Sequence, residues 1–358
     1  MKAWAWVLLV LSAIAIKWIS LYPEIVEKYY TYGLYPVIAR TQRFLLGWIP
    51  FSIGDLFYGF LILVVLFKTF QLFRVIFKKQ FNKEYLLAGL KQIIFFFLFV
   101  YVFFYGLWGL NYSRQGIAKQ LGITVRKYDI HSLDTLTDVL ISRLNLYAGK
   151  VSDEQFDAFR KKKTLFSLST LAYEKARTNY PFLRYPPKSL KPSLYSYLGN
   201  YLGFQGYYNP FSGEGQVNTT VPSFLEPFVS CHEIGHQLGY ARENEANFIA
   251  FLACKDYDND LYRYSLYFDL YHYAVSEMYR IDSLQASTYE DKLAPLVKKH
   301  QQDYRDFYNR YRNPVEPLIT KLYGQYLKAN NQPEGKRSYN LVIAWLIAYY
   351  QKFGKDAL

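Results

Sequence analysis

The sequence predicts a mainly α-helical protein with a small β-sheet, an α+β domain preceded by three transmembrane helices. Long apolar segments fill the first third of the chain, and apolar residues recur at helical spacing through most of the remainder. A stretch that mixes Tyr, Val and Thr with glycines lies between residues 194 and 221 and is typical of strands. Because 51% of the 358 residues are hydrophobic, the chain can bury a sizeable core, and a disordered protein is excluded.

Three segments are long and apolar enough to cross about 30 Å of hydrocarbon as helices. They are residues 3–19, 53–73 and 93–110. The first is interpreted as an uncleaved span, because no small-x-small cleavage site precedes Leu21. We therefore expect a membrane region over residues 1–112 and an extracytoplasmic domain over residues 113–358.

The distribution of basic residues predicts the orientation in the bilayer. The connection between the second and third spans and the span ends beside it carry six basic residues, Lys68, Arg74, Lys78, Lys79, Lys83 and Lys91. Basic connections stay cytoplasmic, so the amino terminus is expected inside and the domain outside, in the periplasm of a bacterium whose inner membrane holds the spans. The net charge of +13 comes without a compact basic cluster or a nucleic-acid motif, so the expected partners are the lipid bilayer and a substrate.

After the third span, the pattern predicts mostly helices around one short β region. Residues 133–148 and 153–177 have helical spacing, the proline-rich residues 180–192 interrupt it, and two strands joined by a loop are expected between residues 194 and 221. Further helices are expected at residues 224–238, 241–256, 261–281, 289–311, 315–329 and 339–353. The apolar residues 341–350 are too few for a fourth span and are interpreted as a packed helix.

The segment His232-Glu233-Ile234-Gly235-His236 predicts a zinc site on the helix over residues 224–238, which ends near Gly239. Residues four apart share one helix face, so both imidazoles can bind one ion at about 2.0 to 2.1 Å. Glu233 is turned away from that pair, yet can reach a water molecule beside the metal and act as a general base. The chain has only five His, so two of them flanking a Glu is an unusual choice for an ordinary helix surface.

A catalytic zinc ion needs a third protein ligand, and the candidates are Glu243 and Glu245. If the chain reverses at Gly239, the next helix runs back along the first and Glu243 lies level with the second histidine. Asn247 is then placed to hydrogen-bond the far nitrogen of His232. Glu245 points roughly 200° away from Glu243 on an ideal helix, so both cannot face one ion, and Glu243 is favoured.

The run His232-Glu233-x-x-His236, followed by Glu243-x-x-Ala246-Asn247, resembles the gluzincin pattern. The longer stretch over residues 206–248 resembles a bacterial family of membrane-anchored, zincin-like proteins of unknown function, and this likeness covers most of the chain. The resemblance implies a zincin-like peptidase fold with zinc. The link between the second histidine and the glutamate is shorter than in the thermolysin type, and Asn247 stands where Asp is usual.

Several residues near the motif allow more than one interpretation. The stretch 213–220 is either an exposed edge that binds the substrate backbone or an ordinary hairpin, and Glu214 within it is expected to be a solvated turn residue. His272, or one of the tyrosines Tyr271 and Tyr273, is a candidate to stabilise an oxyanion.

The remaining cysteines and histidines are expected to have no chemical role. Cys231 and Cys254 lie at different levels of the two helices, so they are expected to be buried free thiols. His131 and His300 stand among polar residues and are expected at the surface.

These observations favour a membrane-anchored zinc metallopeptidase that cleaves extracytoplasmic peptides or proteins. An intramembrane protease is disfavoured, because the motif helix carries several polar residues and is not an apolar span. The alternative from a different class is a non-catalytic membrane scaffold that keeps the fold for binding, against which the intact Glu233 speaks.

Overall fold

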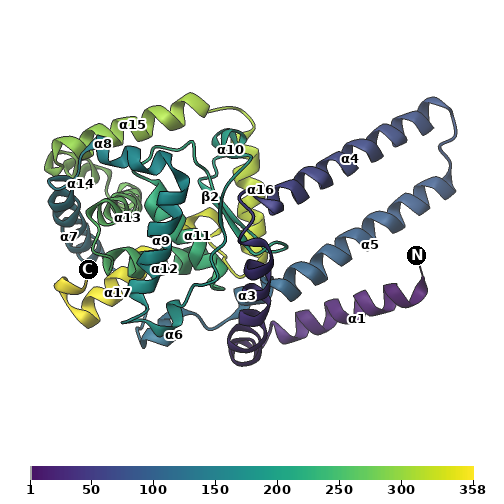
Figure 1. The fold of residues 1–358 in the computed structure, drawn as a ribbon, viewed down its shortest axis with the longest axis horizontal. Coiled ribbons are helices and arrows are strands. Elements are labelled where there is room, and N and C mark those ends of the chain that lie inside the picture. Colours follow the sequence, from purple (N-terminus) through teal and green to yellow (C-terminus); the bar gives the residue numbers. More distant parts are fainter. Residues whose placement is uncertain (1) are drawn as a thin grey trace.

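The computed structural model describes residues 2–358 as a helical body with three helices that project from one side (Figure 1). We call these three helices the stalk: α1 (Ala3–Ile19), α4 (Ile53–Phe77) and α5 (Lys83–Leu107). Two of them, α4 and α5, have 25 residues each and are long and apolar enough to span a membrane. Their side chains are almost entirely uncovered by protein, as expected for helices that face lipid.

The expectation of three spans is corrected to two. Helix α1 has 17 residues, a length of about 26 Å that falls short of a hydrocarbon core of about 30 Å. The chain then bends by 101° into the stretch Pro23–Leu46, and a third span is reached only if this bent pair counts as one. Helix α1 nevertheless lies beside α5, where Trp6 and Phe95 pack edge to face with ring centroids 5.2 Å apart.

Both long stalk helices begin with a side-chain cap. Ser52 accepts a hydrogen bond from the backbone N–H of Asp55 at 3.0 Å, and Asn82 accepts one from that of Tyr85 at 2.8 Å. The turn between α4 and α5 lies at the end of the stalk away from the body, as does the amino terminus (Figure 1). The basic connection therefore lies on one side of any membrane that the stalk crosses, and the body lies on the other.

The body is mainly helical. Its α-helices are α2 (Pro23–Ile25), α3 (Tyr35–Leu46), α6 (Ile117–Leu121), α7 (Ile130–Ala148), α8 (Asp153–Phe156), α9 (Lys162–Ala176), α10 (Ser196–Leu202), α11 (Glu226–Gln237), α12 (Glu243–Lys255), α13 (Asp260–Ile281), α14 (Ser283–Thr288), α15 (Pro295–Tyr311), α16 (Glu316–Ala329) and α17 (Val342–Phe353). A π-helical stretch, η1 (Val26–Leu34), precedes α3. Short 3₁₀ turns complete the body, namely η2 (Gly109–Ser113), η3 (Asp157–Arg160), η4 (Pro181–Leu183), η5 (Glu290–Lys292), η6 (Gly335–Tyr339) and η7 (Lys355–Ala357).

Two predicted helices are interrupted. The one expected over residues 153–177 is split into α8, η3 and α9, and the one expected over residues 289–311 begins only at Pro295. Proline fits the first turn of a helix and lacks the N–H that an interior position needs, so α15 starts there. The apolar stretch 341–350 forms a packed helix, as predicted: residues 342–350 belong to α17, and most of them are buried in the core.

The sheet has three strands, β1 (Leu190–Pro192), β2 (Gly206–Asn209) and β3 (Glu214–Val217), in the order β1-β3-β2. Strands β2 and β3 form the predicted hairpin, antiparallel with Gly206 opposite Val217. Strand β1, which pairs parallel to β3, was not predicted because it lies in the proline-rich stretch. Of the two interpretations of residues 213–220, the ordinary hairpin is confirmed and the exposed edge is wrong, because β3 is the central strand and β2 is an outer one.

The motif helix lies in the middle of the body. Every residue of α11 is buried, and the helix packs against α9, α12 and α13 on one side and against β2 and β3 on the other. All but the last residue of α12 is buried as well. A helix that carries His and Glu side chains and yet has no solvent-exposed face must place those side chains in a specific polar site.

Glu214 is buried, which corrects the expectation of a solvated turn residue. Its carboxylate accepts hydrogen bonds from the backbone N–H groups of Gly54 and Ile53 at 2.7 and 3.2 Å, and from the Ser212 hydroxyl at 2.9 Å. These donors include the free N–H groups in the first turn of α4, where the helix dipole also favours an anion. Glu214 thereby binds the central strand of the sheet to the start of a stalk helix.

Candidate metal centre

The motif helix ends where the sequence predicts. Gly239 has a φ of +87°, and the N–H groups of Gly239 and Tyr240 donate to the carbonyls of His236 and Gly235 at 3.0 and 3.1 Å. A left-handed glycine is the common way to end a helix and turn the chain. A Cβ atom at Gly239 would lie 2.7 Å from the ring of Tyr35, so space as well as conformation requires glycine there.

Helix α12 then packs closely against α11. A Cβ atom added at Gly235 would lie 3.3 Å from the Cα and carbonyl oxygen of Ala246, so the two helices meet at a pair of small residues. This close approach brings the start of α12 beside the two motif histidines.

Three ligand atoms meet at the junction of these helices. The Nε2 atoms of His232 and His236 lie 3.2 and 3.3 Å from the same carboxylate oxygen, Oε2 of Glu243. The ligand atoms of the three residues all lie within 4.8 Å of one another, and all three residues are buried. Two imidazole nitrogens and one carboxylate oxygen at this separation form a group that can hold a single metal ion.

The other ring nitrogen of each histidine has a hydrogen-bond partner. Nδ1 of His232 lies 2.7 Å from Oδ1 of Asn247, as predicted, and Nδ1 of His236 lies 2.8 Å from the backbone carbonyl oxygen of Tyr240. A carbonyl oxygen can only accept, so each Nδ1 carries a proton, and Nε2 is the nitrogen of each ring that can bind a metal ion beside Glu243. Such outer partners fix the tautomer and ring orientation of metal-binding histidines.

The two oxygens of Glu243 have different surroundings. Oε1 accepts a hydrogen bond from the Tyr323 hydroxyl at 2.7 Å, whereas Oε2 is buried and has no hydrogen-bond partner among the described residues. The backbone N–H of Glu243 donates to Oε1 of Gln332 at 3.0 Å. The side chain is therefore held by one oxygen while the other faces the histidines.

The pKa values reflect how tightly these groups are buried together. Burial lowers the pKa of His232. Burial also acts against the charged form of His236, but the neighbouring Glu243 and Glu233 carboxylates outweigh it and raise the pKa of His236 to about 9. Burial alone would raise the pKa of Glu243, yet the positive charge on His236 and the closeness of both imidazoles bring it well below its ordinary value. In the metal-free site, His236 therefore holds a second proton, on Nε2, beside an ionised Glu243.

Glu233 lies on the same helix and is almost fully buried against the sheet. A Cβ atom at Gly206 of β2 would lie 2.5 Å from Glu233 Oε1, so the carboxylate rests directly on the strand. Its other oxygen, Oε2, is buried without a hydrogen-bond partner among the described residues. Burial raises the pKa of Glu233 to about 8, against the lowering effect of His236.

A cleft of about 280 Å³ opens onto the site. His232 and Glu233 line it, together with residues of β2, α13, α15, α16 and the segment around Tyr339. Tyr339 lies parallel to the His232 ring with centroids 6.1 Å apart. The cleft gives a substrate access to Glu233 and His232, which is what a candidate active site requires.

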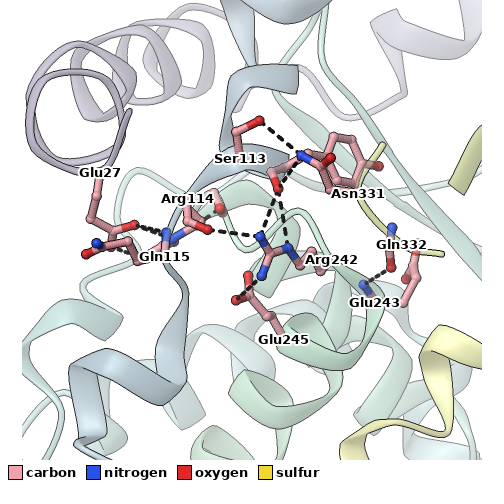
Figure 2. A network of polar contacts seen from close by, with 11 residues as sticks. Glu27, Ser113, Arg114, Gln115, Arg242, Glu243, Glu245, Asn331 and Gln332 are labelled. Atoms are coloured by element: carbon pink, nitrogen blue, oxygen red, sulfur yellow. Dashed lines mark hydrogen bonds and ion pairs between the residues drawn. The ribbon is translucent and has the colours of Figure 1, made fainter. Parts of the chain in front are cut away.

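Glu245, the alternative third ligand, faces away from the histidines. It lies 3.8 Å from Nη1 of Arg242, in a network that also contains Arg114 and Glu27 (Figure 2). A Cβ atom at Gly116 would lie 2.0 Å from its carboxylate, so Glu245 fits against the glycine of the segment that follows the stalk. The structure brings Glu243, and not Glu245, to the histidines.

The network in Figure 2 joins four distant segments around the start of α12. Arg242 donates to the carbonyls of Tyr112 and Arg114 at 3.1 and 3.0 Å, and Arg114 pairs with Glu27 at 3.1 Å. Asn331 donates to the Ser113 hydroxyl at 3.1 Å, next to the Gln332 that holds Glu243. The position of the third candidate ligand therefore depends on contacts from η1, η2 and the segment after α16.

Among the candidate oxyanion stabilisers, only Tyr273 lines the cleft. His272 and Tyr271 line a separate hollow, and Nδ1 of His272 lies 3.0 Å from the backbone carbonyl oxygen of Phe268. Neighbouring residues of a helix point in different directions, so His272 lies outside the site although Tyr273 lines the cleft.

The other singled-out residues lie away from the site. Cys231 and Cys254 are buried free thiols, as predicted, and His131 is exposed. His300 is buried, which corrects the expectation of a surface residue: its two ring nitrogens lie 2.6 Å from the Tyr264 hydroxyl and 2.5 Å from Oδ1 of Asp153. These two polar partners explain how a histidine can be buried there.

Sequence reasoning missed Tyr323, Tyr339 and Gln332. They come from segments at least 80 residues beyond Glu243 along the chain, and tyrosine occurs 37 times, so no spacing pattern distinguishes these positions. Only the fold brings them to the site.

A protein-family model described as "Protein of unknown function (DUF3810)" matches residues 30–347 of the chain. No curated protein and no solved structure matches it. The match covers the stalk helices α4 and α5 as well as both histidines and Glu243.

We predict that Asn247→Ala weakens zinc binding by about 10- to 100-fold, because His232 loses the acceptor that orients its ring. Competition with a fluorescent zinc chelator would measure the affinity. The matched control is Asn244→Ala on the same helix, whose side chain makes no hydrogen bond to either histidine among the described residues. Equal affinities in the two variants would contradict this role of Asn247.

Zinc affinity should also rise with pH. In the metal-free protein, His236 is protonated below a pH of about 9, and that proton occupies the nitrogen that faces Glu243. A metal ion must displace it, so affinity should increase by about tenfold per pH unit between about pH 6.5 and 8.5. Calorimetric titrations with zinc at several pH values, in buffers of different ionisation enthalpy, would count the protons released on binding. A zinc affinity that does not change with pH, with no proton released, would exclude a proton on His236 that the metal must displace.

Proposed function

The chain belongs to the DUF3810 family, and we propose that it is a membrane-anchored zinc metallohydrolase that cleaves peptide bonds. The observation that carries the proposal is the convergence of His232, His236 and Glu243 on one point, beside the buried and partly unpartnered carboxylate of Glu233. This combination has the parts that metal-assisted hydrolysis needs, namely a metal-binding group, a base next to it, and a cleft. Its likeness to the gluzincin pattern supports the same activity.

The donor set fits zinc. Two neutral imidazoles and one carboxylate are a common ligand set of catalytic zinc ions, which keep a fourth position open. Glu243 supports this choice, since its buried Oε2 atom faces only the two histidine nitrogens, and a buried carboxylate is costly without a cation beside it. Among the described residues no thiol belongs to the group of candidate ligands.

A bound zinc ion would supply a Lewis acid and lower the pKa of water in the site. Glu233 would take a proton from the attacking water molecule, whose oxygen forms a bond to the carbonyl carbon of the peptide. When the C–N bond breaks, Glu233 would deliver the proton to the leaving nitrogen, and the new carboxylic acid and amine then ionise to a carboxylate and an ammonium group. The positive charge of the ion would lower the pKa of Glu233 from about 8, so that it can act as a base near neutral pH.

The cleft favours an extended peptide as substrate. Gly206, the first residue of the outer strand β2, borders the cleft next to Glu233. An extended chain can lie along such an outer strand and make backbone hydrogen bonds, which bind peptides with little dependence on side chains. Aromatic side chains on the facing walls, including Tyr273 and Tyr339, would contact the peptide's side chains.

The proposed location is a bacterial inner membrane with the body in the periplasm. Two helices are long enough to span a bilayer, and the basic connection lies at the end of the stalk away from the body. The positive-inside rule assigns that end to the cytoplasm. The substrates would then be periplasmic peptides or proteins.

We predict that Glu233→Gln keeps bound zinc but lowers peptide hydrolysis by about 10² to 10⁴, the range that a general base contributes. The assay would use the full-length protein in detergent with a mixed peptide library, read by mass spectrometry. Glu174→Gln, on the exposed surface of α9, is the control, and a chelator should abolish activity in it. Cleavage that survives both the chelator and the Glu233 change would refute the proposal.

A further inference from the structure

Three helices on the side of the body from which the stalk emerges (Figure 1) carry exposed apolar side chains. On α16, Leu318 and Leu322 are 56% and 58% exposed, and the residues one turn before and after them, Val315 and Tyr326, are exposed as well. Their spacing of three or four residues puts them on one face of the helix. A continuous apolar stripe of this kind is unusual on a surface that meets water.

Helix α10 and the residue before its cap repeat this pattern. Leu194, Tyr197, Leu198 and Tyr201 are all exposed, at a spacing that again places them on one face. The opposite face carries the buried polar residues of the helix, which point into the body. The helix is therefore turned with its apolar side outward.

Helix α3 and the residues just after it also expose apolar side chains. Phe44 is 73% exposed and Trp48, two residues beyond the end of the helix, is 79% exposed, whereas Arg43 is buried and donates to the carbonyl oxygens of Gln237 and Pro187. The stretch that contains α3 lies at 101° to α1, so it runs across the direction of the stalk. A helix with this orientation would lie along a membrane surface if the stalk crosses the bilayer.

Each of these helices is attached to the base of the stalk. The N–H of Leu194 donates to Asp55 Oδ2 of α4 at 2.7 Å, and the Tyr195 hydroxyl donates to the Asp55 carbonyl at 2.9 Å. Tyr105 of α5 donates to Oδ1 of Asn330, directly after α16, at 2.7 Å, and α3 also contacts α5. The exposed apolar faces thus continue the surface that the stalk presents to lipid.

We propose that the exposed apolar faces of α3, α10 and α16, which we call the stalk-side surface, are embedded in the interfacial layer of the bilayer. Aromatic side chains such as Trp48 and Tyr197 are enriched at this depth of membranes. Exposed lysines on one flank of α16, Lys321 and Lys328, can extend to lipid phosphates while their stems cover apolar surface. The partner of this surface is the lipid bilayer itself.

This placement brings the cleft to the membrane surface. Helix α16 lines the cleft with Ile319, Thr320 and Tyr323, while its neighbouring face carries Leu318 and Leu322. The segment Leu202–Gly206, which follows α10, forms another wall of the same cleft. Two walls of the cleft are therefore continuous with the stalk-side surface.

The substrate class follows from this position, and it rests on the proposed hydrolase function. A cleft at the level of the headgroups reaches the segment of a membrane-tethered chain that lies next to its anchor. It is poorly placed for folded proteins away from the membrane. We therefore assign to the site extended peptide segments that are attached to the bilayer by a lipid or a helix.

Fluorescence quenching tests the stalk-side surface without any need for activity. The full-length protein carrying Leu322→Cys would be labelled with an environment-sensitive dye. It would then be reconstituted into vesicles of phosphatidylcholine and phosphatidylglycerol. Part of the phosphatidylcholine would bear a nitroxide, which quenches the dye, at carbon 5 of the acyl chain. The native cysteines are buried, so labelling is selective. The matched control is Leu146→Cys, an exposed leucine on α7, which lies across the body from the stalk (Figure 1).

We expect at least twofold quenching at position 322 and none at position 146. Equal quenching at both positions would overturn the proposal. Protection of position 322 from the nitroxide together with self-association of the protein would also overturn it, because the partner would then be a second copy of the chain.

The substrate class needs a second measurement. A mixed peptide library would be offered to the reconstituted protein either free or linked to a lipid anchor, and cleavage of the tethered form should be at least tenfold faster. Equal rates would reject the tethered substrate while leaving the hydrolase intact. Cleavage of neither form would reject the proposed function, whereas the quenching result would stand independently.

Discussion

The structure depends on one buried contact, in which two imidazole nitrogens face the same carboxylate oxygen of Glu243 at 3.2 and 3.3 Å. Bringing these groups together requires a helix that stops at Gly239, a reversal of the chain, and a close approach of Gly235 to Ala246. It also requires partners for the outer atoms, which Asn247 and the Tyr240 carbonyl provide. A group of this kind is unfavourable in a protein core unless a cation neutralises it, so the fold around it indicates a binding site.

The motif site and the stalk are parts of one structure. The carbonyl oxygens at the end of α11 accept hydrogen bonds from Tyr35 of α3 and from Trp108 at the end of α5, at 2.8 and 3.0 Å. The sheet beside α11 is bound to the start of α4 through Glu214, and the start of α12 is held by the network of Arg114 and Arg242 (Figure 2). A membrane anchor joined by a flexible linker would show no such contacts. The membrane helices therefore help to shape the candidate site and do more than tether it.

Local patterns in the sequence were sufficient for the parts of the site that lie close together along the chain. The histidine pair, Glu233, the reversal at Gly239 and the hydrogen bond that His232 donates to Asn247 follow from helical spacing over 16 residues. Most helices and the β2–β3 hairpin were predicted for the same reason. Sequence patterns failed where contacts between distant segments determine a residue's environment. Glu214 was expected to be a turn residue but caps a stalk helix, and His300 was expected at the surface but is buried with two polar partners. Tyr323 and Gln332 reach Glu243 only through the fold. The predicted number of membrane spans was wrong because composition cannot show the sharp bend that follows Ile19.

The central claim is that one zinc ion binds to His232, His236 and Glu243. Zinc K-edge X-ray absorption on the purified full-length protein tests it most directly, since the spectrum reports the elements and distances around the ion. The account predicts two imidazole nitrogens and additional oxygen ligands, all at about 2.0 to 2.2 Å. A zinc–sulfur distance of about 2.3 Å, or a shell without imidazole scattering, would contradict it.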